Sequence, residues 1–161
     1  MVCKVIQLSV TNYIFCGDDI LFLKRHPSKR IAPNKLLGVG GKLEPNENFI
    51  LAAIRETQEE TGYIIHPSDI HFSGISNLKT VLGDDKEWLV GIFLIEVKTK
   101  TIPVGNHTSD GEFLWINKHS LFKDNYNFID DFYYYVDSLL NNKLFFMVFD
   151  YTESHVFNRI I

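Results

Sequence analysis

Cysteine is scarce in this sequence, and its scarcity argues against a fold held together by disulfide bridges. Cys3 and Cys16 are the only two cysteines among 161 residues, and neither belongs to a Cys-x-x-Cys pair. Two cysteines are too few for a disulfide framework. We therefore expect reduced thiols and a cytoplasmic setting, because structural disulfides persist mainly in oxidising compartments.

Long apolar runs are also missing. No stretch approaches the roughly 20 apolar residues that a membrane-spanning helix needs. Residues 1–4, Met-Val-Cys-Lys, do not begin a charged leader followed by a cleavable apolar stretch. We expect neither secretion nor insertion into a membrane.

The chain has no excess of positive charge. Lysine and arginine number 16 against 20 aspartates and glutamates, which gives a formal net charge of -4. Binding to long nucleic acid needs a broad basic surface, so we do not expect that partner. A small phosphorylated ligand stays compatible with this balance, because a bound metal ion can supply positive charge locally.

The remaining composition is that of an ordinary globular protein. Hydrophobic residues make up 45% of the chain and charged residues 22%, which argues against global disorder. A length of 161 residues suits one hydrophobic core. Because no repeat or Pro/Gly/Ser-rich linker divides the sequence, we expect a single domain over residues 1–161.

Apolar and β-branched runs separated by turn signals predict strands, and longer segments with helical spacing predict two helices. The expected strands are Ile6–Phe15 and Ile20–Leu23, joined in a hairpin at Gly17–Asp19, then Ile70–Ser76, Trp88–Val97, Phe113–Ile116, Leu144–Phe149 and Val156–Ile161. The expected helices are Asn48–Thr61, with Asn46 or Asn48 as cap and Gly62 past its end, and Asp130–Leu140. The stretch His26–Lys35 is predicted to be a loop, and Gly83–Lys86 a turn. This order predicts an α+β fold with a mixed sheet between helices.

Three carboxylates gather on one face of the first predicted helix. At about 100° per residue, Glu56, Glu59 and Glu60 fall within about 100° of one another. Like charges at this spacing repel, so the cluster is unfavourable by itself. A divalent cation reverses that effect, and Mg²⁺ prefers hard oxygen ligands shared with substrate phosphates. The alternative is that these glutamates form only a solvated helix face.

The other residues of the predicted helix suggest how it packs. Ala52 and Ala53 lie one turn before the carboxylates on the same face, where small side chains leave room for a ligand. The opposite side is predicted to pack on the sheet, and it carries Ile50, Leu51, Ile54 and Thr57.

The wider pattern around these glutamates resembles the Nudix box, Gly-x5-Glu-x7-Arg-Glu-U-x-Glu-Glu-x-Gly-U, where U is an apolar residue. All seven fixed positions match, with Gly41, Glu47, Arg55, Glu56, Glu59, Glu60 and Gly62. A chance match is on the order of one in a million per chain. The apolar positions hold Thr57 and Tyr63, which are mild departures.

The resemblance to Nudix hydrolases implies an α/β/α sandwich in which the box forms a loop, a helix and a loop. It implies Mg²⁺ as cofactor, with Mn²⁺ possible, and carries Glu56, Glu59 and Glu60 over as metal ligands. Gly40 or Gly41 is implied as a backbone-carbonyl ligand, and Arg55 and Glu47 as an ion pair that orients the carboxylates.

Two roles stay open within the resemblance. The group that removes a proton from the attacking water is expected to be Glu59, with Glu112 of the Ser109–Glu112 loop as second candidate and further acidic ligand. Lys42 is expected either to contact phosphate or to be a solvated lysine.

Beyond the box, the chain resembles the diphosphatases of oxidised purine nucleoside triphosphates. That resemblance implies a small nucleotide as substrate, in a monomer or homodimer. It also implies that Asp130 or Asp131 reads the purine edge, although both aspartates also suit a helix N-terminus. Leu37 is a departure, because it stands where that group commonly has an asparagine that contacts the base.

Other interpretations remain. The substrate is alternatively another nucleoside diphosphate derivative, such as a sugar or dinucleotide compound, or the chain is a binding module without catalysis. The aromatic run at residues 132–135 either stacks on a base or belongs to the core.

Overall fold

The computed structural model describes residues 5–79, 86–152 and 155–160, and describes the side chains up to residue 150. Cys3, most of the predicted turn Gly83–Lys86 and the last residue of the predicted strand Val156–Ile161 lie outside the described residues. Within the described part of the chain, no helix is long and apolar enough to cross a membrane.

The described residues form one mixed sheet in the order β3-β2-β1-β5-β4-β7-β8, with β6 paired to β2. The strands are β1 Ile6–Cys16, β2 Asp19–Arg25, β3 Leu36–Leu37, β4 Ile70–Leu78, β5 Glu87–Glu96, β6 Gly111–Asn117, β7 Phe145–Thr152 and β8 His155–Ile160. The pairs β1–β5 and β4–β7 are parallel and the other pairs antiparallel. The sequence did not predict β3, a strand of two residues that borders the site described below.

The hairpin predicted at the start of the chain forms between β1 and β2. Cys16 pairs with Asp19, so the turn consists of Gly17 and Asp18. Gly17 has φ 60°, in the left-handed region that glycine adopts without a steric penalty.

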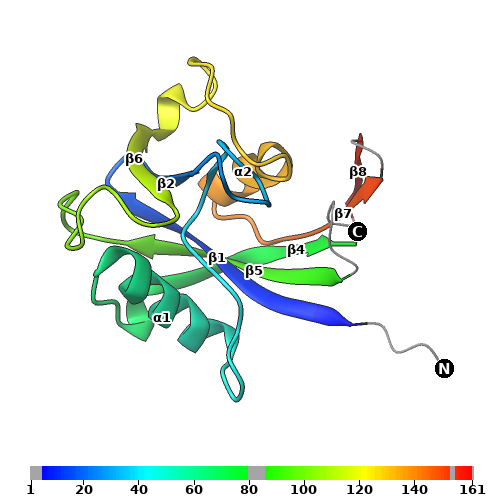
Figure 1. Cartoon of the computed structure of the whole chain (residues 1–161), viewed down its shortest axis with the longest axis horizontal. Coiled ribbons are helices and arrows are strands. Elements are labelled where there is room, and N and C mark those ends of the chain that lie inside the picture. The colour runs from blue at the N-terminus through cyan, green and yellow to red at the C-terminus, as the bar shows by residue number, and fades with distance from the viewer. Residues whose placement is uncertain (1–4, 80–85, 153–154, 161) are drawn as a thin grey trace.

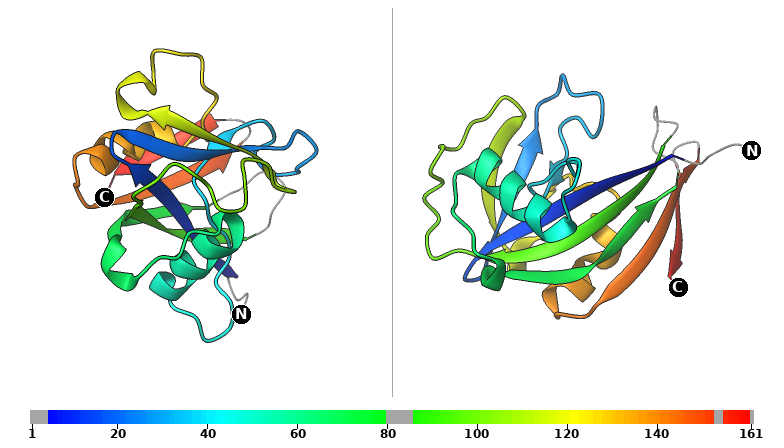
Figure 2. Two further views of the ribbon diagram at one scale, coloured as in Figure 1. Left: turned by 90° about the vertical axis from the view of Figure 1, so that its left-hand side faces the viewer. Right: turned by 90° about the horizontal axis from the view of Figure 1, so that it is seen from below.

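The two main helices, α1 Phe49–Thr61 and α2 Phe132–Leu140, lie on opposite faces of this sheet (Figures 1 and 2). The predicted α+β sandwich is therefore confirmed. Short 3-10 turns at Pro67–Asp69 and Lys118–Ser120 complete the helical segments.

The ends of α1 are fixed by two residues that flank it. The Asn48 side chain accepts a hydrogen bond from the Leu51 backbone N–H at 2.9 Å. Gly62 ends the helix with φ 77° and donates its N–H to the Gln58 carbonyl. Both caps agree with the prediction from the sequence.

The predicted packing of α1 is confirmed for Thr57 but was wrong for Ala52, Ala53, Ile50 and Leu51. Ala52, Ala53 and Thr57 are fully buried against the sheet, whereas Ile50 and Leu51 are about half exposed, at 48% and 50%. Small side chains face the sheet because α1 lies close to β1, so Ala52 and Ala53 fill the core and leave no room for a ligand.

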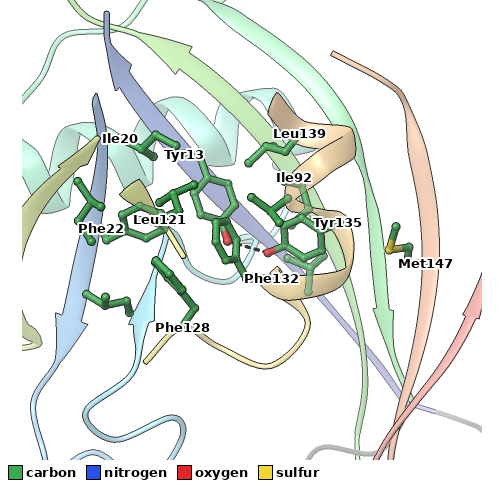
Figure 3. Packing of buried hydrophobic residues seen from close by; sticks show 14 of the residues in the cluster. Tyr13, Ile20, Phe22, Ile92, Leu121, Phe128, Phe132, Tyr135, Leu139 and Met147 are labelled. Carbon is green, nitrogen blue, oxygen red and sulfur yellow. Dashed lines mark hydrogen bonds between the residues drawn. The ribbon is translucent and has the colours of Figure 1, made fainter. Parts of the chain in front are cut away.

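On the other face of the sheet, α2 packs on an aromatic core. Figure 3 shows Tyr13 of β1 and Tyr135 of α2 meeting in this core, where their hydroxyl groups are 2.7 Å apart. Phe132 and Tyr135 are fully buried, whereas Tyr133 and Tyr134 are nearly half exposed. The core interpretation of the run at residues 132–135 therefore holds for Phe132 and Tyr135. The helix begins at Phe132, so Asp130 and Asp131 precede it.

Candidate active site

The glycine-rich segment before α1 runs against β1. Asn12 and Val39 exchange two backbone hydrogen bonds, and the Gly41 carbonyl accepts from the Val10 N–H at 2.8 Å. A Cβ atom on Gly40 would collide with the Val10 carbonyl, and one on Gly41 would collide with the Glu56 carboxylate. These close approaches explain why glycine occupies both positions.

Asn12 fixes α1 on the sheet, a role that no pattern in the sequence indicates. Its side chain is fully buried and donates to the Ala53 carbonyl and to the Thr57 hydroxyl, both at 2.9 Å. This hydrogen bond to Thr57 explains why threonine, and not an apolar residue, occupies position 57 of the box. The other departure, Tyr63, is also buried and donates its hydroxyl to the Thr99 carbonyl.

Arg55 connects the loop before α1 to the acidic face of the helix. Its Nε and Nη2 donate to the two carboxylate oxygens of Glu47, both at 2.9 Å. Nη1 donates to Glu56 at 2.8 Å and to Glu59 at 3.1 Å, and Nη2 also reaches the Lys42 carbonyl. The ion pair implied by the resemblance is thus present as a bidentate contact, and the same guanidinium orients two further carboxylates.

The carboxyl groups of this face differ in the direction in which their surroundings shift their pKa values. The Arg55 guanidinium lowers the pKa of Glu47. Burial raises the pKa of Glu56, although Arg55 opposes the shift. Burial, with the nearby charges of Glu56 and Asp110, raises the pKa of Glu60 to about 8.

Glu60 also has an unsatisfied oxygen. Its Oε2 atom is buried without a hydrogen-bond partner among the described residues, while the backbone N–H of Gly40 bonds to the carboxylate. Such a group is costly to ionise unless a cation compensates it. The orphaned oxygen and the raised pKa both fit a divalent cation that takes oxygen ligands.

The metal ligands implied by the resemblance do not form a closed cluster. Within the described part of the chain, no three acid, histidine or cysteine side chains converge as in a metal site. The reason is that Arg55 holds Glu56 and Glu59, whereas Glu60 turns toward Gly40. The Gly41 carbonyl already accepts from Val10, so the carbonyl of Gly40 is the better candidate ligand of the two.

Glu59 is the accessible carboxylate of this face. Its side chain is 60% exposed, against 12% for Glu56. It lines a cavity of about 790 Å³ along the outward side of α1, together with Glu47 and Arg55. A water molecule can therefore reach Glu59.

The side chains of the two residues with open roles make other contacts. Glu112 is the second residue of β6, opposite Lys24 of β2, and not a loop residue as expected. No described hydrogen bond or ion pair joins it to α1; the acid of this region that raises the pKa of Glu60 is Asp110. Lys42 lies over the Trp88 ring, 5.5 Å from its centroid.

A second cavity, of about 380 Å³, lies on the α2 side and is bounded by β3 and the loop before α2. It is lined by Thr11, Arg25, Arg30, Ile31, Ala32, Pro33, Lys35, Leu37, Leu78, Val90, Ile129, Asp130 and Asp131. Leu37 is among these residues and offers no hydrogen bond. No aromatic side chain of the described residues lines the cavity, so the run at residues 132–135 supplies no stacking platform there.

The two aspartates of this cavity differ. Asp130 is an ion-pair partner of Lys35, and its side chain is 46% exposed. Asp131 is 5% exposed and accepts a hydrogen bond from Ser76 at 3.1 Å. Burial raises the pKa of Asp131 to about 6.

Arg25 connects the two parts of the site, and the sequence reasoning missed it. It lines the cavity that contains Asp131, and its charge also acts on the Glu60 carboxyl. Its Nε atom is buried without a hydrogen-bond partner among the described residues. A basic run at Lys24–His26 was visible, but only the fold shows that Arg25 lies between the cavity and α1.

Comparisons with known proteins agree with this arrangement. A family model described as NUDIX domain matches residues 5–136. The fold is similar to that of a MutT protein from Bacillus halodurans, with 18% identity, TM-score 0.77, and 96% of this chain and 97% of that chain covered. It is also similar to a MutT protein from Methanosarcina mazei Go1, with 20% identity, TM-score 0.67, and 88% and 96% covered.

A third solved structure carries a different activity in its name. It is a bifunctional NMN adenylyltransferase/ADP ribose pyrophosphatase from Francisella tularensis, complexed with AMP and a manganese ion. Identity is 20% and the TM-score 0.64, and the match covers 86% of this chain and 42% of that chain. At these identities, the likeness shows a shared fold and does not choose between substrates.

Proposed function

The chain belongs to the Nudix family, whose hydrolases act on pyrophosphate bonds, and we propose that it converts a nucleoside or deoxynucleoside triphosphate to the monophosphate and pyrophosphate. Within this activity, we propose oxidised purine nucleotides as candidate substrates. The observation that carries the proposal is the pair of buried carboxyls, Asp131 at the cavity and Glu60 on α1, with Arg25 between them.

Mg²⁺, or Mn²⁺ in its place, is the proposed cofactor, held by Glu56, Glu59, Glu60 and the Gly40 carbonyl. When bound, the cation neutralises phosphate charge and makes the attacking water more acidic. Arg55 and Glu47 are positioning residues, because their bidentate contact fixes the guanidinium that holds Glu56 and Glu59.

Glu59 is the proposed general base. Its carboxylate is exposed to water and anchored by Arg55, so it can accept a proton from the attacking water without leaving the acidic face. Glu112 is less suitable, because no described contact brings it to α1. We propose no catalytic role for Lys42, which lies over Trp88.

The base of the nucleotide is proposed to occupy the cavity beside β3. Asp131 is the carboxyl placed to read its edge, since Asp130 is paired with Lys35 at the surface. Arg25 reaches from this cavity toward Glu60, and a phosphate placed between them satisfies its unpartnered Nε.

A panel of nucleotides tests this function. The purified protein is incubated with normal and oxidised purine triphosphates, pyrimidine triphosphates, ADP-ribose and dinucleoside polyphosphates, with and without Mg²⁺, and the products are separated by anion-exchange chromatography. We expect monophosphate and pyrophosphate from a purine triphosphate, in a cation-dependent reaction.

The metal site is tested without turnover. Mg²⁺ is expected to raise the melting temperature of the wild-type protein, because it binds the folded state. Glu60→Gln should lose most of this rise while the metal-free protein stays folded, since Gln matches the size of a carboxyl that is mainly protonated at neutral pH without the metal. An equal Mg²⁺ effect in the wild-type protein and this variant would rule out Glu60 as a ligand.

The second candidate is hydrolysis of another nucleoside diphosphate derivative, such as a sugar or dinucleotide compound. Leu37 favours this candidate. Its side chain cannot form the hydrogen bond to the base that an asparagine at this position commonly provides in the diphosphatases of oxidised purine nucleotides. The same panel separates the two, since ADP-ribose yields AMP and ribose phosphate without pyrophosphate. Absence of any cation-dependent hydrolysis would favour a binding module.

A further inference from the structure

Behind the cavity lies a buried polar contact that joins two distant parts of the chain. Ser76 of β4 is fully buried, and its hydroxyl donates to Oδ2 of Asp131 at 3.1 Å. Asp131 lines the cavity, whereas Ser76 does not. Ser76 therefore contacts Asp131 from outside the lining of the cavity.

The backbone N–H groups of Asp131 and Phe132, at the start of α2, bond to this carboxyl, but the usual capping contact is missing. Asp131 occupies the N-cap position of α2, but its side chain makes no capping hydrogen bond. Its backbone has helical angles, φ -69° and ψ -27°, unlike the extended conformation usual at a cap. The contact from β4 therefore adds a side-chain donor on Oδ2 to the local backbone contacts of this carboxyl.

A neighbouring hydroxyl is engaged elsewhere. Burial raises the pKa of Tyr13, and the charge of the nearby Asp131 carboxylate raises it further. Its hydroxyl is bound to that of Tyr135 at 2.7 Å within the aromatic core (Figure 3). Ser76 is thus the hydroxyl that is placed on the Asp131 carboxyl itself.

We propose that Ser76 is a positioning residue for ligand selection: by holding Oδ2 of Asp131, it directs Oδ1 of the same carboxyl toward the ligand in the cavity. The inference rests on the proposed function, in which the cavity takes a purine base. Without Ser76, Oδ2 loses its side-chain donor, and only the backbone N–H groups of Asp131 and Phe132 still hold the carboxyl. Both carboxyl oxygens of Asp131 can then bind the ligand. The protein therefore distinguishes less well between bases that differ at one edge atom.

Binding to the metal-free protein tests this role independently of catalysis. The probes are dGMP, 8-oxo-dGMP and dAMP, whose Kd values are measured by calorimetry. The variants are Ser76→Ala, Ser76→Thr, which keeps a hydroxyl, and Ser73→Ala as matched control. Ser73 is a buried serine of the same strand, 5% exposed, that lines a different cavity.

Ser76→Ala should change the ratio of the Kd values by about tenfold, because a hydrogen bond to a buried carboxyl is lost. Ser76→Thr should restore the wild-type ratio, and Ser73→Ala should leave it unchanged. A folded Ser76→Ala variant with the wild-type ratio overturns the proposal, as does a variant that weakens all three ligands equally. The proposal also fails if the wild-type protein binds none of the three.

The test of Ser76 can be distinguished from the test of the proposed hydrolase activity. If the wild-type protein hydrolyses nucleotides but Ser76→Ala leaves the ratio unchanged, the hydrolase function stands and the positioning role is rejected. If no hydrolysis occurs but the Kd ratio depends on Ser76, the positioning role stands and the proposed hydrolysis is rejected.

Discussion

Two buried carboxyl groups lie in the two parts of the site, and they are stabilised in different ways. On α1, Glu60 has an oxygen without a described partner, and burial with neighbouring negative charge raises its pKa to about 8. At the cavity on the other face, Asp131 accepts a hydrogen bond from Ser76, and its pKa is raised only to about 6.

The difference indicates what each group needs for its task. A carboxyl with one unsatisfied oxygen, close to other acids, is a suitable cation ligand. A carboxyl held by a neutral hydroxyl and by backbone N–H groups keeps its orientation, which suits recognition of a base. We therefore expect changes on α1 to affect every substrate and changes at the cavity to affect the choice among substrates.

The largest effect is expected at Glu59. Replacement by Gln keeps the size of an exposed side chain but removes its negative charge, so kcat should fall at least about 100-fold for every substrate. Steady-state kinetics on the best nucleotide measures this change, with Glu44→Gln in the preceding loop as control. Near-native turnover in a folded Glu59→Gln variant would remove Glu59 from the site.

Replacement of Arg55 should lower both activity and stability. Arg55→Ala leaves Glu47 and Glu56, whose side chains are only 10% and 12% exposed, without their cation. We expect a loss of about 3 kcal/mol in the free energy of unfolding, measured with urea, together with reduced activity. Arg55→Lys should be intermediate, because lysine cannot make the bidentate contact. An unchanged free energy of unfolding in Arg55→Ala would mean that the contacts of Arg55 with Glu47 and Glu56 do not stabilise the folded protein.

At the cavity, the two neighbouring aspartates give a matched pair. Asp131→Asn should change the ratio of kcat/KM between oxidised and normal purine triphosphates, since a lost buried base contact costs about 1–3 kcal/mol. Asp130→Asn should leave this ratio nearly unchanged, because Asp130 pairs with Lys35. If neither variant shifts the ratio, the proposed preference for oxidised purine nucleotides should be replaced by hydrolysis of another nucleotide class.

The smallest effect concerns pH. The pKa of Asp131 is about 6 in the folded protein and about 3.9 in an unfolded chain, so the folded state binds the proton more tightly. The contribution of this group to stability is therefore complete below about pH 4 and is lost as the pH rises to about 6. Relative to Asp131→Asn, the wild-type protein should lose stability over that window. Urea unfolding in metal-free buffer measures the free energy of unfolding of both proteins at each pH. A constant difference between the two proteins over this window would contradict the raised pKa of Asp131.

The two parts of the site also differ in how well the sequence predicted them. The acidic face, its caps and the pair of Arg55 with Glu47 lie within a short segment, where helical spacing relates sequence to position. The face of α1 that packs on the sheet was mispredicted, because close contact with β1 selects Ala52 and Ala53 over larger side chains.

The cavity could not be assembled in the same way. It joins residues from β1, β2, β3, β4, β5 and the loop before α2, and no spacing in the chain relates them. Asp130 and Asp131 were indistinguishable in the sequence, since only the fold brings Ser76 to one and Lys35 to the other. The contact of Ser76 with Asp131 spans 55 residues and depends on how α2 packs on the sheet.

The most direct test of the proposed hydrolysis is a reaction in ¹⁸O-labelled water, followed by mass spectrometry of the products. The wild-type protein and a purine nucleoside triphosphate are incubated with Mg²⁺, and a parallel reaction contains a chelator. We predict one labelled oxygen per turnover, shared between the monophosphate and pyrophosphate products according to which phosphorus is attacked, and no turnover in the chelator. Equal hydrolysis in both reactions, or no hydrolysis of any nucleoside diphosphate derivative with Mg²⁺ or Mn²⁺, would contradict the account.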